Sequence, residues 1–313
     1  MRFGVHLPSN HGWRHVEDLL DVARLSEELG YESVWASQHV FHAGYLADRL
    51  DGRPYYAPLP ILTAVAAVTT RVRLGTSVLV LPYHHPVLLA KELATLDVLS
   101  GGRLTAGVGV GVIREEFEAL GVEYDTRGAR TDEALRVMKA LWTTRQPSFA
   151  GRFHRFAGLD FSPAPVQDPH PPIWIGGSSG AAMRRAATLG DGWHLFRHPA
   201  GGLRTAIHRV RDLAGRDGRS LVVSVRCDLE ILGTPVPAPA DYNTSLGTRF
   251  RLRGTPEQIV EMVGELRDLG VEHLVLAVNT DEPNVVTDSV GIFATEVAPG
   301  FGFPCGSGPG PGR

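Results

Sequence analysis

The stretch RLGTSVLVLPYHHPVLLAKELATLDVLSGGRLTAGVGVG, residues 73–111, decides the fold of this chain. Residues 74–81 are apolar and rich in β-branched side chains, which is typical of a strand buried on both faces. Pro82 ends that strand, because proline lacks the N–H that a sheet ladder needs. Residues 87–99 carry apolar side chains at helical spacing, and residues 104–108 return to a strand pattern. The order predicts two parallel strands joined by a right-handed helical crossover.

The rest of the chain repeats this alternation of strand and helix. The predicted strands cover residues 3–7, 33–36, 74–81, 104–108, 173–175, 192–195, 221–232 and 273–278. Eight strands in alternating order favour a (β/α)8 TIM barrel, an α/β fold, over a doubly wound sheet. We predict a single domain over residues 1–299, with insertions near residues 41–58, 150–170 and 234–250. Residues 300–313 are rich in Gly and Pro, and we expect a disordered tail there.

Composition narrows the class of protein. A net charge of -3 argues against nucleic acid as the main partner. No apolar run is long enough to span a bilayer, and the N-terminus is typical of a first strand rather than a signal peptide. Cys227 and Cys305 lie far apart and indicate neither a disulfide framework nor a metal site. We therefore expect a cytoplasmic enzyme that acts on a small molecule, without a metal or a membrane.

In a TIM barrel the chemistry lies on loops at the carboxyl ends of the strands. The candidates at these places are His6, His39, residues 77–82, residues 107–111, residues 176–179 and residues 194–198.

Gly176-Gly177-Ser178-Ser179 follows a strand and opens a helix, so its backbone N–H groups are placed to bind phosphate. The alternative is an ordinary capped turn. The run at residues 107–111 is not G-x-G-x-x-G, so a dinucleotide fold is disfavoured. Its glycines instead leave room for a flat ring at the barrel mouth.

His39 stands at a strand end, where it is either structural or a proton donor and acceptor. We expect His84 and His85 to cap a helix or to line the cleft. The sequence offers no third ligand beside them for a metal ion. The helix dipole alone explains Glu115 and Glu116 in the first turn of a helix. We expect Arg184 and Arg185, inside a helix, to face solvent.

Several motifs carry a resemblance to a known family. They are WASQHV (residues 35–40), LGTSVLVLPYHHP (74–86), LSGGRLTAGVGVG (99–111), REEFEALG (114–121), PPIWIGGSS (171–179) and GDGW (190–193). Their order and spacing resemble the bacterial luciferase-like family of flavin and deazaflavin enzymes, from Phe3 to about Pro299. The likeness is strongest to its coenzyme F420-dependent oxidoreductases.

The resemblance implies a role for each candidate. A non-prolyl cis peptide between Ser77 and Val78 would form a bulge that bends the deazaflavin ring, and Gly107 and Gly109 would border that ring. The loop with Gly176, Gly177, Ser178 and Ser179 would hold the cofactor phosphate, and His39 would act as acid or base. The substrate pocket would include His6, Gln38, Tyr56 and His194. The resemblance also implies a homodimer.

Departures from the family pattern refine this expectation. Luciferase-type flavin monooxygenases bind the FMN phosphate with an arginine where this chain has Val110, which weighs against FMN. Deazaflavin sugar-phosphate dehydrogenases have Asp and Glu where this chain has Gln38 and Val112, which weighs against a sugar phosphate. We therefore expect hydride transfer from reduced coenzyme F420 to a C=C, C=N or C=O bond of a small organic substrate. The alternatives are an FMN-dependent monooxygenase that uses dioxygen and a non-catalytic cofactor-binding relative.

Overall fold

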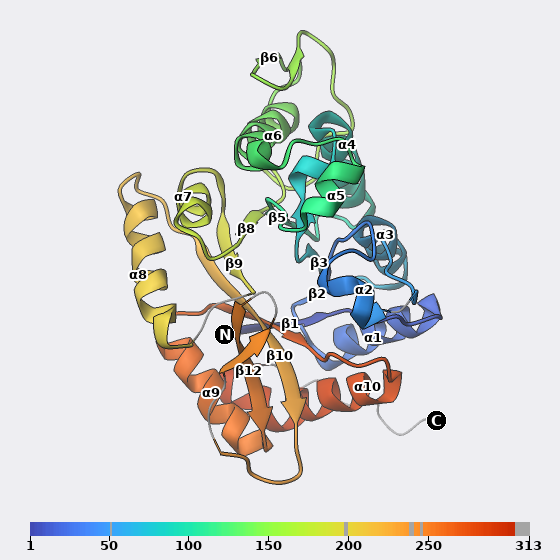
Figure 1. Cartoon of the computed structure of the whole chain (residues 1–313), viewed down its shortest axis with the longest axis vertical. Coiled ribbons are helices and arrows are strands. Elements are labelled where there is room, and N and C mark those ends of the chain that lie inside the picture. The colour runs from blue at the N-terminus through green and yellow to red at the C-terminus, as the bar shows by residue number, and fades with distance from the viewer. Residues whose placement is uncertain (51, 197–199, 238–240, 245–246, 304–313) are drawn as a thin grey trace.

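The computed structural model describes residues 1–303 apart from 51, 197–199, 238–240 and 245–246 (Figure 1). Within these residues, eight parallel strands form a closed ring in the order β1-β2-β3-β5-β8-β9-β10-β13, with β13 pairing back to β1. The strands are β1 (Arg2–His6), β2 (Ser33–Ala36), β3 (Arg73–Thr76), β5 (Leu104–Gly109), β8 (Ile173–Gly176), β9 (Gly192–Leu195), β10 (Val222–Ile231) and β13 (His273–Ala277). The predicted (β/α)8 barrel is confirmed.

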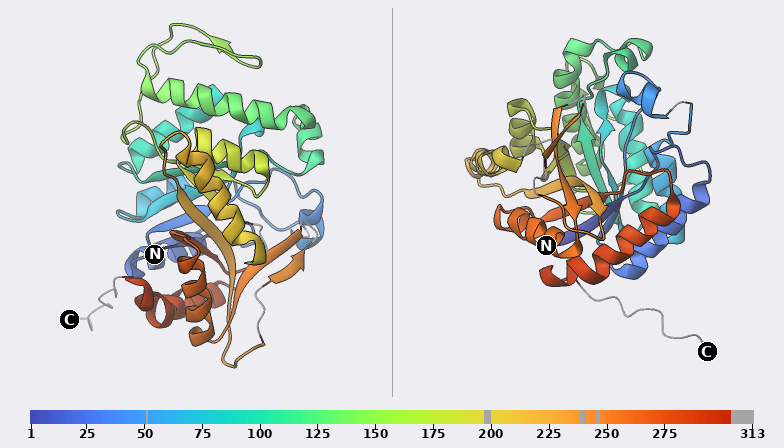
Figure 2. Two further views of the ribbon diagram at one scale, coloured as in Figure 1. Left: turned by 90° about the vertical axis from the view of Figure 1, so that its left-hand side faces the viewer. Right: turned by 60° about the horizontal axis from the view of Figure 1, so that its bottom comes forward.

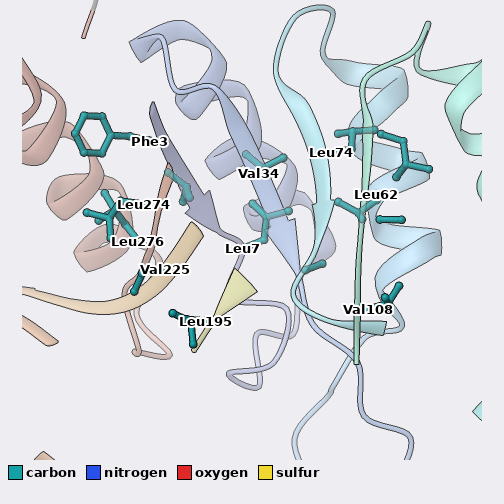
Figure 3. Close-up of a cluster of buried hydrophobic side chains, with 14 of the residues drawn as sticks. Phe3, Leu7, Val34, Leu62, Leu74, Val108, Leu195, Val225, Leu274 and Leu276 are labelled. Atoms are coloured by element: carbon teal, nitrogen blue, oxygen red, sulfur yellow. The ribbon is translucent and has the colours of Figure 1, made fainter. Parts of the chain in front are cut away.

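Helices surround the strands on the outside (Figures 1 and 2). The longer ones are α1 (Val16–Leu29), α3 (Pro58–Val68), α4 (Pro86–Leu99), α6 (Arg127–Thr143), α7 (Gly180–Leu189), α8 (Ala200–Gly215), α9 (Pro256–Asp268) and α10 (Pro283–Ile292). Figure 3 shows the layer between them and the barrel, where Leu62 of α3 packs near Leu74 and Val108 of the sheet. This aliphatic layer is the main core, and it forms because alternate strand residues point outward.

The three predicted insertions contain short elements. Helix α2 (Tyr45–Leu50) lies in the first insertion, and the hairpin of β6 (Phe149–Ala150) and β7 (Arg155–Phe156) projects beyond α6 in the second (Figure 1). Strands β11 (Asp241–Thr244) and β12 (Gly247–Gly254) pair antiparallel in and after the third.

The end of the described chain belongs to the core, which differs from the expectation of a disordered tail from residue 300. The rings of Phe301 and Phe303 meet Phe3 edge-on, with centroids 6.1 and 5.8 Å away. Aromatic burial therefore orders residues 300–303 despite the nearby glycines. The remainder of the predicted tail, residues 304–313, lies outside the described residues.

The inside of the barrel is filled by two tryptophans opposite glycines. Trp35 and Trp174 are buried and stack with ring centroids 5.1 Å apart. A Cβ on Gly75 would lie 2.2 Å from Cε3 of Trp35, and one on Gly192 would lie 2.5 Å from Cδ1 of Trp174. These glycines are therefore required by the bulk of the indoles, and the barrel is packed up to the level of its mouth.

The predicted third strand is divided at the mouth. Strand β3 ends at Thr76, the Ser77–Val78 peptide bond is cis, and β4 (Leu79–Val80) then pairs with Val108 and Gly109 of β5. The non-prolyl cis bond thus stands where the family resemblance implied it.

Candidate functional site

A cavity of about 890 Å³ opens at the carboxyl ends of the barrel strands. Ten of the predicted site residues line it: Gln38, His39, Ser77, Val78, Gly109, Gly176, Gly177, Ser178, Ser179 and His194. Its volume is within the range of sites that enclose a cofactor-sized molecule. The described residues contain no group of three or more His, Cys, Asp or Glu side chains that could hold a metal ion. They also contain no helix that is both long and apolar enough to cross a membrane.

Val78 forms a raised wall between two glycines. A Cβ on Gly109 would lie 2.8 Å from Cγ2 of Val78, and one on Gly176 would lie 3.0 Å from its Cγ1. A side chain at Gly109 would therefore collide with Val78, and one at Gly176 would be tighter than an ordinary contact. The Val78 side chain therefore presents an apolar surface next to the backbone of the two glycines, and the face of a flat ring can pack against such a surface.

His39 is held by a carboxylate from another loop. Its Nδ1 donates to Oε2 of Glu116 at 3.1 Å, and the same carboxylate accepts from Tyr83 Oη at 2.8 Å. It also accepts from the backbone N–H groups of Val40 and Phe41 at 2.6 and 3.1 Å. Burial alone raises the pKa of Glu116, but these hydrogen bonds, led by that of His39, outweigh it and bring the pKa below its ordinary value.

The role of Glu116 corrects the interpretation of this residue as a helix-dipole carboxylate. Its side chain is fully buried in the first turn of α5 (Arg114–Ala119), whereas the adjacent Glu115 is exposed. A dipole effect needs no burial, so the helix terminus does not explain Glu116. Sequence reasoning missed it because its partner is 77 residues away.

Gln38 is fixed across the mouth of the cavity. Its Oε1 accepts from the backbone N–H of Val80 at 2.8 Å, and its Nε2 lies 2.8 Å from Nε2 of His84. Burial lowers the pKa of His84, so a neutral imidazole meets the amide. Gln38 therefore ties β2 to β4, and Glu116, rather than the residue before His39, orients the imidazole.

The loop after β8 forms another part of the cavity wall. Gly177 has a positive φ of 113°, and Ser179 caps α7 by accepting from the N–H of Ala182 at 3.2 Å. The loop therefore brings the start of α7 to the cavity wall, where backbone N–H groups and the helix dipole favour an anion.

Two arginines also line the cavity. Arg185 is only 7% exposed, lines the cavity, and pairs with Asp132 at 2.5 Å. The expectation that Arg185 faces solvent is therefore wrong, because packing of α7 against α6 buries it. Arg127 also lines the cavity and stacks over the ring of Tyr124 at 3.8 Å. Arg184, in contrast, is exposed as expected.

The segment after β5 lines the cavity at two places. Residues 109–112 line it beside Val78, and Asp125, Arg127 and Gly128 line it near the loop after β8. Glu116, which holds His39, lies between them.

Three predicted site residues lie outside the lining. Gly107 is a packing residue, since a Cβ there would lie 1.8 Å from the backbone oxygen of Thr76. His6 is buried at 2% exposure in β1. Tyr56 packs on the core and donates to the backbone oxygen of Arg14 at 3.1 Å, so its neighbour Tyr55 lines the cavity instead.

His194 and Arg226 also line the cavity. Burial, assisted by the charge of Arg226, lowers the pKa of His194 to about 3, so the imidazole is neutral at pH 7. Arg226 lies over the ring of Phe196 at 4.2 Å, and its Nη1 is 3.4 Å from the backbone oxygen of Ser77. Sequence reasoning missed Arg226, although a charged residue within an apolar strand was a usable signal.

The chain is similar to known proteins in both sequence and fold. The model of a family described as "Luciferase-like monooxygenase" matches residues 1–231. An FMNH(2)-dependent dimethylsulfone monooxygenase of Pseudomonas putida is 34% identical over 207 residues, which cover 65% of this chain and 55% of that protein. The chain thus spans little more than half the length of the curated relatives that it matches first.

Two solved structures share the fold over 96% of this chain. The monooxygenase RslO1 from Streptomyces bottropensis has a TM-score of 0.82 at 23% identity, with 99% of its own chain covered. An F420-dependent secondary alcohol dehydrogenase, in complex with an F420-acetone adduct, has a TM-score of 0.79 at 20% identity, with 98% covered.

Proposed function

The chain belongs to the luciferase-like monooxygenase family, and we propose that it is an oxidoreductase that uses the deazaflavin coenzyme F420. The resemblance inferred from the motifs is confirmed at the level of the family. In the proposed reaction, the reduced cofactor delivers hydride to a C=C, C=N or C=O bond of a small organic substrate. A single domain, a homodimer and a cytoplasmic location belong to the same proposal, and sedimentation and cell fractionation test the last two.

The residues of the cavity fit such a cofactor. Val78, between Gly109 and Gly176, offers a surface for the ring, and the loop at Gly177 and Ser178 offers N–H groups for the phosphate. Gly107 supports this arrangement from below by allowing β3 and β5 to approach. When bound, the reduced deazaflavin supplies a hydride.

The outer side of the phosphate end also favours F420, because that cofactor carries an anionic tail beyond its phosphate. A Cβ on Gly180, the first residue of α7, would lie 3.6 Å from Nη1 of Arg184 and 3.7 Å from Nη2 of Arg209. Both arginines are exposed, so they are accessible to carboxylates that extend out of the cavity.

The pairing of His39 with Glu116 is the observation that carries the proposal. Hydride addition to a polar double bond leaves a negative charge that must take up a proton, and histidine performs that transfer near neutral pH. Since Nδ1 is bonded to Glu116, exchange with the substrate runs through Nε2. The ionised carboxylate fixes the ring and balances its charge when the ring is protonated.

An FMN-dependent monooxygenase is the second candidate. The named curated relatives favour it, since the Pseudomonas putida protein is described as FMNH(2)-dependent. Val110 weighs against FMN, but Arg127 and Arg185 supply positive charge at the phosphate end from other elements. The third candidate, a cofactor-binding relative without catalysis, shares the same cavity.

Titration with each cofactor separates these candidates. We expect the purified protein to bind F420 more tightly than FMN, and to oxidise reduced F420 without taking up oxygen when a suitable carbonyl or enone is present. Tight FMN binding with oxygen uptake and no affinity for F420 would establish the second candidate. Normal F420 affinity without turnover across substrate classes, unchanged in His39→Ala, would establish the third.

A further inference from the structure

A chain of side-chain hydrogen bonds crosses the interior of the barrel and ends at the cavity. Each member is at most 7% exposed, so bulk water does not compete for these bonds. In order, the chain runs through Trp35, Ser33, His273, Ser224, His194 and Ser77.

The distances define five links. Nε1 of Trp35 lies 2.8 Å from Oγ of Ser33, which lies 2.9 Å from Nε2 of His273. Nδ1 of His273 is 3.5 Å from Oγ of Ser224, the longest link. Ser224 Oγ is 2.9 Å from Nδ1 of His194, whose Nε2 is 2.8 Å from Oγ of Ser77. Space for this chain is built in, since a Cβ on Gly4 would lie 2.4 Å from Oγ of Ser33.

Each link except the first can run in either direction. Burial lowers the pKa of His194 and of His273, so each imidazole is neutral at pH 7 and carries one N–H. A hydroxyl also has one proton to donate. Consequently, the direction of one link settles the direction of the next.

The closed end of the chain breaks the symmetry, because the indole N–H of Trp35 can only donate, which leaves Nε2 of His273 as the acceptor for the Ser33 hydroxyl. If Ser33 accepts from Trp35 and donates to His273, every donor between Trp35 and Ser77 has an acceptor. In the reverse direction Ser33 accepts from both neighbours, and its buried proton has no acceptor among them. An unsatisfied buried donor is costly, so the first direction is favoured.

We propose that the closed end of this chain, at Trp35 and Ser33, sets its direction, so that His194 donates from Nε2 to Ser77, and Ser77 offers its own proton to the molecule bound in the cavity. In the reverse direction Ser77 would donate to His194 and present only lone pairs to a ligand. The chain therefore makes Ser77 a hydrogen-bond donor, suited to a carbonyl oxygen or an imine nitrogen. The direction stands without a cofactor, whereas assigning the acceptor to a deazaflavin or flavin ring rests on the proposed function.

Histidine tautomers in the ligand-free protein test the direction. Long-range ¹H–¹⁵N correlation spectra at pH 7, assigned with His194→Asn and His273→Asn, distinguish Nε2–H from Nδ1–H. We expect His194 as the Nε2–H tautomer and His273 as the Nδ1–H tautomer. Finding His194 as the Nδ1–H tautomer would overturn the proposal.

Cofactor affinity tests the final link. Ser77→Ala should weaken binding of the preferred cofactor by about tenfold, and Ser77→Thr should restore most of it. An equal loss of affinity in Ser77→Ala and Ser77→Thr would show that Ser77 does not donate a hydrogen bond to the ligand. The tautomer measurement would not be affected by that outcome. If the protein binds neither F420 nor FMN, the proposed function fails, and the direction of the chain is judged by the tautomers alone.

Discussion

The carboxylate of Glu116 lies 3.1 Å from Nδ1 of His39 and also accepts the backbone N–H groups of Val40 and Phe41. One buried side chain therefore fixes both the imidazole and the loop that follows it. Since Tyr83 donates to the same carboxylate, three elements meet at Glu116. This arrangement positions His39 more firmly than its own place at a strand end could.

Replacing Glu116 by Gln should separate binding from turnover. The amide cannot accept all four hydrogen bonds, so His39 loses its fixed orientation and the charge that balances its protonated form. We expect turnover with reduced F420 to fall about a hundredfold while cofactor affinity changes little. The control is Glu115→Gln at the exposed neighbouring position, and equal activity of the two variants would contradict the role of Glu116.

Stability should fall on mild acidification because His194 and His273 are buried as neutral groups. Their folded-state pKa values are lowered, to about 3 for His194, so below pH 6.5 the unfolded chain binds protons that the folded chain does not. Their stabilisation is complete above pH 6.5 and decreases as the pH falls toward the folded-state pKa values. The slope that each contributes to the free energy of unfolding approaches about 1.4 kcal/mol per pH unit once the pH is well below 6.5.

Urea unfolding between pH 7 and 5 measures this slope. His194→Asn should reduce the slope by about 1 kcal/mol per pH unit, averaged over this range. His15→Asn, at an exposed position, is the control. Equal slopes in the wild type and His194→Asn would show that His194 is not held neutral.

Replacement of two glycines of β5 by alanine should have different effects on stability and on cofactor binding. Gly107→Ala sets a Cβ against the backbone oxygen of Thr76, which cannot rotate away, so we expect a loss of about 3 kcal/mol or more in the free energy of unfolding. Gly109→Ala meets only Cγ2 of Val78, so it should weaken cofactor binding more than stability.

Gly264→Ala is the control for this pair, because no atom lies within 4 Å of the added Cβ. Unfolding curves and cofactor titrations of the three variants check the contrast. A stable Gly107→Ala variant would contradict the close approach of β3 and β5.

The arginines of α7 should distinguish the two cofactors. Arg185 lines the phosphate end of the cavity, so Arg185→Gln should weaken F420 and FMN alike by about tenfold. Arg184 lies outside it, so Arg184→Gln should weaken F420 alone, through its longer anionic tail. Titration of both variants with both cofactors measures this, and an equal effect of Arg184→Gln on FMN would count against the tail contact.

The barrel was predictable because its signal is local. The strands at Val34 and Leu74 and the helix between Pro86 and Leu99 follow from apolar periods that a short window contains. The division of the third strand at Ser77 was not visible in that period, since residues 78–81 continue the apolar strand pattern beyond Ser77. Only the family resemblance pointed to it.

The site was predictable only in part because its supports are distant in sequence. Glu116 and Arg185 both resemble ordinary helix residues, and their burial depends on contacts with His39 and Asp132. Gly107 and Gly109 share one motif, but the strand beside each decides whether it serves packing or the cavity. Sequence patterns thus located the strand ends and missed the side chains that hold them.

The segment between Gly109 and Gly128 touches the cavity at both of its ends and carries Glu116 between them. A molecule that fills the cavity would brace this segment at two points. Local unfolding of the segment would then require the molecule to leave first, so its susceptibility to proteases would fall as the cavity fills. Occupancy of the site would therefore influence how long the polypeptide survives as well as what chemistry it performs.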